Sequence, residues 1–134
     1  MSSEAYAEVA AALDLFFDGF YEGDIEKLKR IFYPNCHLFS AADGPLVDDS
    51  MEEVYEFIRT RLSPASRGQP RYDRIISIDV AAPESAMAKV QLAFGDRFFT
   101  DYLSLLRIDE QWRIISKTFT YVLLEVATVR LAAE

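Results

Sequence analysis

The stretch that decides the fold is Phe99–Phe119, which reads FTDYLSLLRIDEQWRIISKTF. It alternates as two β-strands around Asp109-Glu110, and so short a connection predicts an antiparallel hairpin. A strand with one side exposed to water alternates apolar with polar residues, whereas both sides of these two strands are largely apolar. The apolar residues are Phe99, Leu103 and Leu105 on one side and Tyr102, Leu106 and Ile108 on the other. Both faces therefore need cover, and we expect helices on one face and a second copy of the chain on the other.

The alternating pattern extends upstream of this hairpin to Tyr72, with breaks at Ala82-Pro83-Glu84 and Gly95-Asp96. These short breaks predict an antiparallel meander that ends near Leu124. From Val122 onwards the chain could prolong the last strand or turn helical, and both alternatives stay open. The expected same-face sets are Tyr72, Arg74, Ile76, Ile78 and Val80 in one strand, and Ala86, Ala88, Val90, Leu92 and Phe94 in the next.

The first half of the chain has helical rather than alternating spacing. Apolar residues recur every three or four positions from Tyr6 to Phe20, which predicts an amphipathic helix that ends at Gly23. Asp24 is placed to cap a second helix, which Pro34 stops, and Cys36–Ser40 predicts a short strand. Ser50-Met-Glu-Glu53 is a capping box that opens a third helix. Residues 1–134 are thus predicted to form one α+β domain, with three N-terminal helices packed on a curved antiparallel sheet.

Composition excludes several classes of protein. The chain has 134 residues and a net charge of −8, which argues against a nucleic-acid partner. No apolar run approaches the roughly 18 residues of a membrane helix, and the first residues do not resemble a secretory leader. We therefore expect a cytoplasmic protein that uses no membrane. Cys36 and His37 supply too few ligands for a structural zinc site, and we expect neither a metal nor another cofactor.

The order of helices, short strand and long meander resembles the nuclear transport factor 2-like superfamily, a cone-shaped, cystatin-like fold. The hairpin Phe99–Phe119 is similar to the branch labelled "putative lumazine-binding", with support from FYEGD at Phe20–Asp24, IISID at Ile75–Asp79 and AMAKV at Ala86–Val90. The superfamily includes isomerases, dehydratases, cyclases and non-catalytic binders. The resemblance therefore implies a fold and a branch, and no single reaction.

The known catalytic residues of the superfamily do not carry over to this chain. Ser40 stands where a steroid isomerase has its general-base aspartate, and Ser104 lies near the position of its second acid. The histidine pair and tyrosine of scytalone-type dehydratases are also missing, because Tyr72 or Asp73, Asp96 and Ser40 occupy the matching places. Asp101 alone matches a polar pocket position of the dehydratase pattern.

Asp101 and His37 are the candidate catalytic residues. Asp101 interrupts an apolar strand, where a carboxylate is costly unless it is paired, so it could be a base, a ligand acceptor or the ion-pair partner of Lys117. If Asp101 faces Phe119, Lys117 is diagonal on the same face; a register shifted by one residue places Lys117 on the opposite face. His37, the single histidine, could act as a general acid or base with Asp101 or simply form a structural hydrogen bond.

Aromatic and hydroxyl side chains predict a pocket for a mostly apolar ligand. Cys36 is interpreted as a small buried hydrophobe, because its neighbour His37 must point to the other face of the strand. The candidate ligand-binding residues are Phe20, Tyr33, Ser40, Tyr55, Tyr102, Ser104 and Thr118.

These features favour a dimeric protein that binds a small apolar or heterocyclic molecule. The alternatives are a cofactor-free isomerase, dehydratase or cyclase that uses Asp101 and His37, and an interaction module that serves assembly only. If the dimer forms through the outer sheet face, a lysine at the outward-facing leucine, Leu103 or Leu105 depending on register, should split it.

Overall fold

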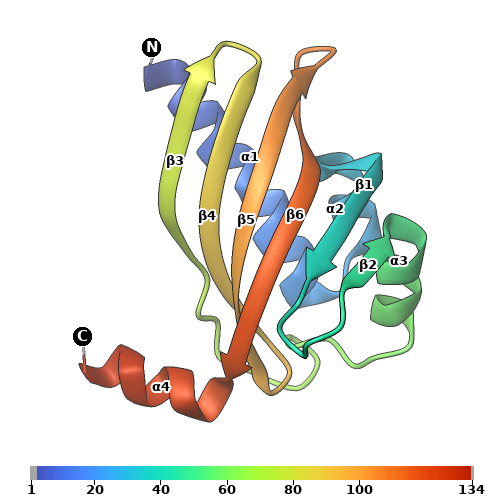
Figure 1. Ribbon diagram of the computed structural model, residues 1–134, viewed down its shortest axis with the longest axis vertical. Coiled ribbons are helices and arrows are strands. Elements are labelled where there is room, and N and C mark those ends of the chain that lie inside the picture. The colour runs from blue at the N-terminus through green and yellow to red at the C-terminus, as the bar shows by residue number, and fades with distance from the viewer. Residues whose placement is uncertain (1–2, 134) are drawn as a thin grey trace.

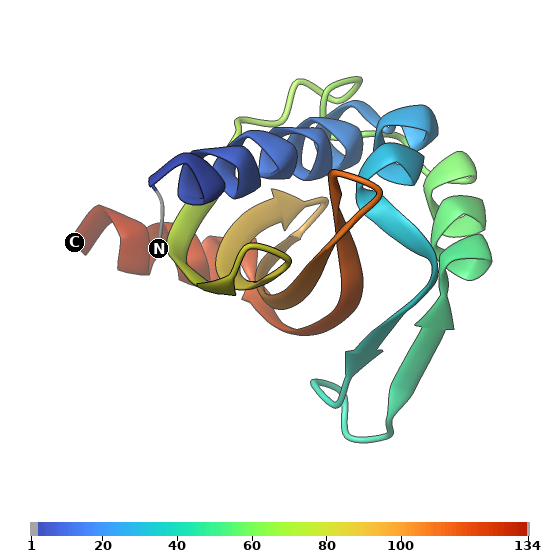
Figure 2. The same ribbon diagram turned by 90° about the horizontal axis from the view of Figure 1, so that it is seen from above.

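A computed structural model describes residues 3–133 as a curved six-stranded sheet with three helices beside its concave face (Figure 1). The sheet bends around α1, as the view from above shows (Figure 2). In chain order the elements are α1 (Ser3–Glu22), α2 (Ile25–Ile31), β1 (Phe32–Ser40), β2 (Val47–Ser50), α3 (Met51–Arg59), β3 (Arg74–Ala82), β4 (Ser85–Phe94), β5 (Arg97–Ile108), β6 (Gln111–Leu123) and α4 (Leu124–Ala133). The predicted α+β architecture is confirmed.

Local sequence accounts for the helices. The Asp24 carboxylate accepts a hydrogen bond from the Lys27 backbone N–H, 3.2 Å away, and caps α2. The predicted capping box opens α3, where the Ser50 and Glu53 side chains bond each other's backbone N–H groups. Apolar residues of α1, among them Leu13 and Phe16, are fully buried against the sheet.

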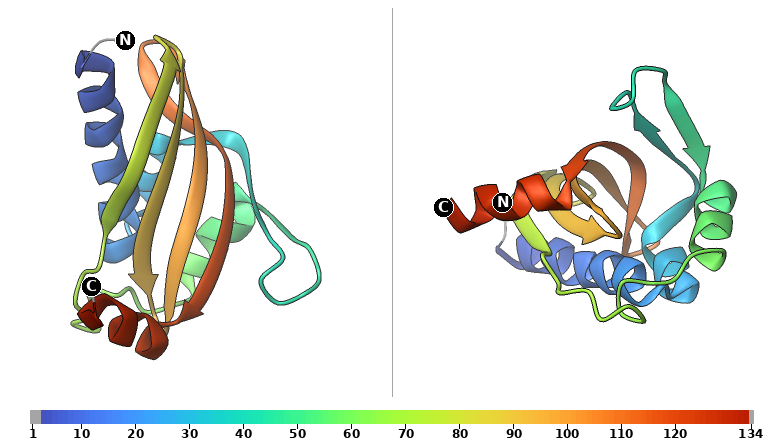
Figure 3. Two further views of the ribbon diagram at one scale, coloured as in Figure 1. Left: turned by 60° about the vertical axis from the view of Figure 1, so that its left-hand side comes forward. Right: turned by 90° about the horizontal axis from the view of Figure 1, so that it is seen from below.

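The sheet has the strand order β2-β1-β6-β5-β4-β3. Most neighbours are antiparallel, as predicted, but β1 and β6 pair in parallel, which the meander pattern did not indicate. The strand β2 was also not predicted; it forms a hairpin with β1 that stands away from the rest of the sheet (Figure 3).

Irregularities in the strands change which side chains share a face. In β3 the register shifts between Ile75 and Ser77, so Arg74 does not lie on the same face as Ile78, and the expected same-face set is wrong. In β4 the prediction is confirmed, because Ala88, Val90 and neighbouring alternate residues are buried. The register also shifts in the β5–β6 hairpin, between Ser104 and Leu105.

The two faces of the sheet are covered differently. The concave face packs against α1, while α4 lies at the end of the sheet and buries Ala127 against Ala93 and Phe98 (Figures 1 and 3). The segment after Val122 thus first prolongs β6 and then turns helical, so each alternative holds for part of it. Of the helices in residues 3–133, none is long and apolar enough to cross a membrane.

Candidate functional site

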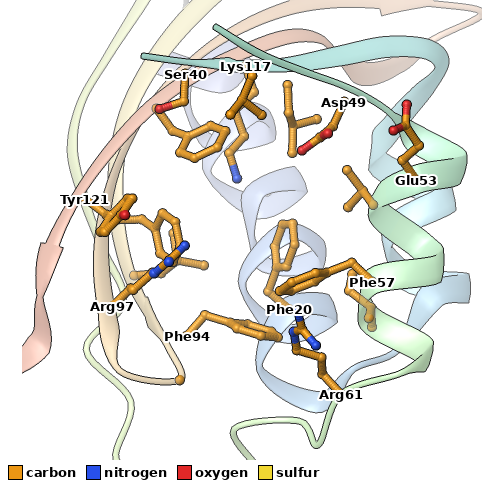
Figure 4. A pocket seen from close by; sticks show the side chains of 18 of the residues that line it. Phe20, Ser40, Asp49, Glu53, Phe57, Arg61, Phe94, Arg97, Lys117 and Tyr121 are labelled. Carbon is orange, nitrogen blue, oxygen red and sulfur yellow. The ribbon is translucent and has the colours of Figure 1, made fainter. Parts of the chain in front are cut away.

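A cavity of about 960 Å³ opens between α1, α3, the β1–β2 hairpin and the concave face of the sheet (Figure 4). Its walls are mostly aromatic and aliphatic, and charged side chains stand at separate points around it. The volume falls within the usual range for small-molecule sites. The lining residues are Phe20, Leu38, Ser40, Asp43, Val47, Asp49, Glu53, Val54, Phe57, Ile58, Thr60, Arg61, Leu62, Arg67, Leu92, Phe94, Gly95, Asp96, Arg97, Phe99, Lys117, Phe119 and Tyr121.

Lys117 is the buried charge of this cavity. It comes from β6 on the concave face, and its ammonium group points into the space between the aromatic walls (Figure 4). Its Nζ lies 4.8 Å from the ring centroid of Phe20, 5.3 Å from that of Phe119 and 5.4 Å from that of Phe16. Ring faces attract a cation when water is excluded, so these rings help to hold the ammonium group in place.

Asp101 is the partner of Lys117, with its Oδ2 3.0 Å from the lysine Nζ. Asp101 faces Phe119 across the hairpin, so Lys117 is diagonal on the same face, one of the two registers that the sequence allowed. The carboxylate is fully buried, and burial raises its pKa above the usual value, against the lowering effect of Lys117. Asp101 is not among the cavity's lining residues, so Lys117 stands between it and a ligand.

His37 does not meet Asp101. On β1 the side chains of Cys36, Leu38 and Ser40 are buried, and His37 lies on the opposite face of the strand. Its Nδ1 is 2.5 Å from Oδ1 of Asp48 on β2, where both side chains are about half exposed. The expected cooperation of His37 with Asp101 fails because alternate residues of a strand point to opposite faces.

Two of the seven candidate ligand residues, Phe20 and Ser40, line the cavity. Tyr55 is buried, and burial raises the pKa of its phenol to about 12, while Tyr33 is exposed near the start of β1. Neither is among the lining residues.

The other three candidates lie on the convex face of the sheet. The inward positions of β5 and β6 include Asp101 and Lys117, so the alternate positions Tyr102, Ser104 and Thr118 point outward, and all three are exposed. The hydroxyl groups of these residues, lying among apolar neighbours in the sequence, predicted a pocket. The same pattern also occurs on the exposed face of a strand, because Thr and Tyr favour strands in general.

Several cavity residues were missed at the sequence level. Asp49 lines the end of the cavity near Lys117, and burial, then the nearby Glu53 and Asp48, raise the pKa of its carboxyl (Figure 4). Arg61 and Arg97 line the opposite end. Asp49 lies on β2, which has only four residues and no alternating signal, so the sequence did not predict this strand.

Cys36 behaves as predicted. It is fully buried, and burial raises the pKa of its thiol to about 12 despite the positive charge of Lys117. A thiol of this kind is unreactive near neutral pH, so the structure supports its interpretation as a small apolar side chain.

Comparison with known proteins gives a family. The family described as "Putative lumazine-binding" matches residues 4–120. A protein named "Aldolase FrzH" from a Cladobotryum species is 23% identical over 121 residues, which make up 89% of this chain and 93% of that protein.

Solved structures show the same fold. A nuclear transport factor 2-like protein of unknown function from Silicibacter pomeroyi superposes with a TM-score of 0.77 at 23% identity, over 91% of this chain and all of that one. Another, from Shewanella baltica, has a TM-score of 0.81 at 18% identity, over 91% and 97% of the two chains. A ketosteroid isomerase-like protein from Erwinia carotovora has a TM-score of 0.65 at 11% identity, over 87% and 95%.

Proposed function

This chain belongs to the "Putative lumazine-binding" family of nuclear transport factor 2-like proteins, and from that premise we propose that it binds a small, flat, mostly apolar molecule in the cavity beside Lys117. The name of the family suggests a heterocycle. The aromatic walls offered by Phe20, Phe94 and Phe119 suit such a ring.

The observation that carries this proposal is the buried Lys117. An ammonium group in an apolar interior is costly unless its charge and its N–H donors are satisfied. Asp101 supports it from one side, and the cavity lies on the other. A carbonyl oxygen of a bound heterocycle would therefore complete the surroundings of the ammonium group, and the oxygen would be held at a fixed place in an otherwise apolar site.

Lumazine, a flat heterocycle with two carbonyl groups, is a direct probe. We expect its fluorescence to change on titration with the protein. Val47→Trp should fill part of the cavity and weaken binding at least about tenfold, because the indole would occupy space that the ligand needs. Thr118→Val, on the exposed convex face next to Lys117 in sequence, is the control and should leave binding unchanged.

Two outcomes would count against this proposal. Equal binding by wild type and Val47→Trp would place the probe elsewhere on the molecule. A loss of binding in Thr118→Val would restore the convex-face hydroxyls as ligand contacts, as the sequence pattern had suggested.

A second candidate function is chemistry on a carbonyl compound, favoured by the placement of Asp49 near Lys117 and by the relative named as an aldolase. Asp49 would remove a proton from the carbon next to the carbonyl. The C–H electron pair would form the new C=C bond, and the carbonyl electron pair would move to oxygen, where the Lys117 ammonium would stabilise the resulting enolate. The raised pKa of Asp49 makes it a stronger base than an exposed aspartate.

Proton exchange tests this second candidate without a known substrate. In D₂O the protein should accelerate the exchange of the α-protons of 2-tetralone, followed by NMR. Asp49→Asn should abolish the acceleration, whereas Asp96→Asn, which alters another cavity carboxylate that does not affect the pKa of Asp49, should retain most of it. Exchange that is no faster than in buffer, or that is unchanged in Asp49→Asn, would leave the protein a binder only.

The convex face supports a homodimer. Met87, Tyr102 and Leu106 are 53%, 46% and 39% exposed on neighbouring strands β4 and β5. Large apolar side chains gathered on one sheet face are typical of an interface. Leu103 and Leu105 both point into the core, so neither is the outward-facing leucine, and Leu106 takes that place.

The dimer has a simple test. Sedimentation at micromolar concentration should give about twice the mass of the 15.3 kDa chain, and Leu106→Lys should reduce it to the monomer. Arg113→Lys, on the adjacent strand β6, keeps the local charge and serves as the control. A wild-type protein that sediments as a monomer would contradict the dimer.

A further inference from the structure

Of the three arginines that line the cavity, Arg61 and Arg97 lie at the end away from Asp49, and Arg67 is the third. Arg61 follows α3 and Arg97 begins β5, so they come from separate parts of the chain, and both line the cavity. In Figure 4 their guanidinium groups approach from two sides, with Phe94 between them. The sequence pattern alone gives no reason for this meeting.

Each guanidinium group is stacked on an aromatic ring of the cavity wall. The Cζ atom of Arg61 is 4.1 Å from the ring centroid of Phe57, and that of Arg97 is 4.2 Å from the ring centroid of Tyr121. Stacking uses the flat face of a guanidinium group and leaves the N–H groups at its edge available. The rings therefore position two sets of hydrogen-bond donors.

Neither arginine has a carboxylate within ion-pair distance among residues 3–133. This contrasts with Arg59, which is 3.3 Å from Glu56, and with Arg71, which is 2.9 Å from Asp18. Arg30, Arg67 and Arg113 also lack such a partner among these residues, so what distinguishes Arg61 and Arg97 is their position on aromatic walls of the cavity.

Carboxylates of the same cavity are engaged elsewhere. Asp43 accepts a hydrogen bond from the Tyr121 hydroxyl, and Glu53 is bound in the capping box of α3. Asp96 precedes Arg97 in the β4–β5 turn and lies outside ion-pair distance of it. The donors of the two arginines thus remain open to an anion from solution.

We propose that Arg61 and Arg97 form a carboxylate subsite, so that the ligand is an acid with a flat apolar body inside the cavity and its carboxylate at the end away from Asp49. A planar carboxylate matches the fork of N–H groups that a guanidinium group presents. The proposal rests on the proposed binding of a small molecule in this cavity, and it adds the charge and the orientation of that molecule.

A matched pair of probes tests it. 2-Naphthoic acid and 2-naphthamide have the same ring and nearly the same shape, but only the acid is an anion at neutral pH. Calorimetric titration should show the acid binding at least about tenfold more tightly, because hydrogen bonds to charged groups are stronger than neutral ones. Added salt should weaken the binding of the acid far more than the binding of the amide.

Substitutions locate the subsite. Arg61→Met and Arg97→Met remove a guanidinium group and keep an unbranched side chain, and each should reduce the preference for the acid several-fold while leaving the amide unaffected. Arg59→Met is the matched control, because Arg59 is an exposed arginine of α3 that pairs with Glu56 and does not line the cavity.

Each remaining result overturns a distinct claim. Equal affinity for the acid and the amide would overturn the carboxylate subsite and leave the binding cavity standing. A preference for the acid that survives both arginine substitutions would place the anion beside Arg67 or Lys117, the other cations that line the cavity, and would also overturn the proposed subsite. If neither probe binds, the proposed binding function fails together with the subsite.

Discussion

The concave side of the sheet and the back of the β1–β2 hairpin each place a carboxylate of an aspartate beside a nitrogen of a basic side chain. Inside, Lys117 and Asp101 are 3.0 Å apart with side chains 7% and 0% exposed. Outside, His37 and Asp48 are 2.5 Å apart with side chains 43% and 49% exposed. The shorter contact is the less important one, because water screens the outer pair and replaces either partner when it is lost. Burial, and not the distance between the two atoms, therefore decides how much each pair contributes to the stability of the fold.

The largest loss of unfolding free energy should come from Lys117→Met. This change leaves the fully buried Asp101 carboxylate without its cation, and breaking a buried pair from one side costs about 3–5 kcal/mol. Denaturant unfolding at neutral pH measures the loss. The double variant Lys117→Met/Asp101→Leu is the control and should recover most of the stability, because no charge is then left buried. A double variant as unstable as the single one would show that packing, rather than charge, sets the cost.

The pH dependence of that loss should be the next largest effect. Burial raises the pKa of Asp101 above 3.8, and removal of Lys117 takes away the charge that lowers it, so the pKa rises further. An acid whose folded-state pKa is raised stabilises the fold below its unfolded pKa, and the contribution is lost as the pH rises through the folded value. The gap between wild type and Lys117→Met should therefore be smallest near pH 4 and widen by up to about 1.4 kcal/mol per pH unit. A gap that is constant from pH 4 to pH 7 would contradict this origin.

A smaller effect should separate two consecutive residues of β1. Cys36 is fully buried on the concave side, and His37 is half exposed on the other. Cys36→Ala removes one buried heavy atom and should cost about 1 kcal/mol, close to the loss of one buried methyl group. His37→Ala should reduce the stability by less. Thermal melts of the two variants measure both losses. The reverse order would mean that the hairpin is held by His37 more than by the core.

The smallest effect should follow Asp48→Asn, which removes the charge of the outer pair. Exposed ion pairs contribute about 0–1 kcal/mol, so the free energy of unfolding should change by no more than that. Asp101→Asn is the comparison, since the same chemical change on the concave side leaves a buried ammonium group without its partner. Similar losses of unfolding free energy in the two variants would contradict the claim that burial makes the inner pair more important than the outer pair.

The sequence by itself determined the elements whose cause is local. The cap at Asp24, the capping box at Ser50 and the alternation along β4 each depend on residues a few positions apart, and all three are confirmed. Helical spacing in the first half and alternation from Tyr72 onwards predicted the fold class, and the resemblance carried chiefly by the Phe99–Phe119 hairpin indicated the family.

Only the tertiary structure decided which residues face the cavity. Next to the turn Leu105 faces Ile114, whereas beyond the register shift Ser104 faces Ser116, and this one irregularity places Lys117 beside Asp101 on the concave face. A shift by one residue reverses the face of every side chain beyond it, and no nearby residue signals it. Tertiary structure also places Arg61 and Arg97 at the same end of the cavity, and Lys117 near the end that Asp49 lines. These contacts join segments far apart in the chain, so the curvature of the sheet and the path of the β1–β2 hairpin decide them, and local sequence does not.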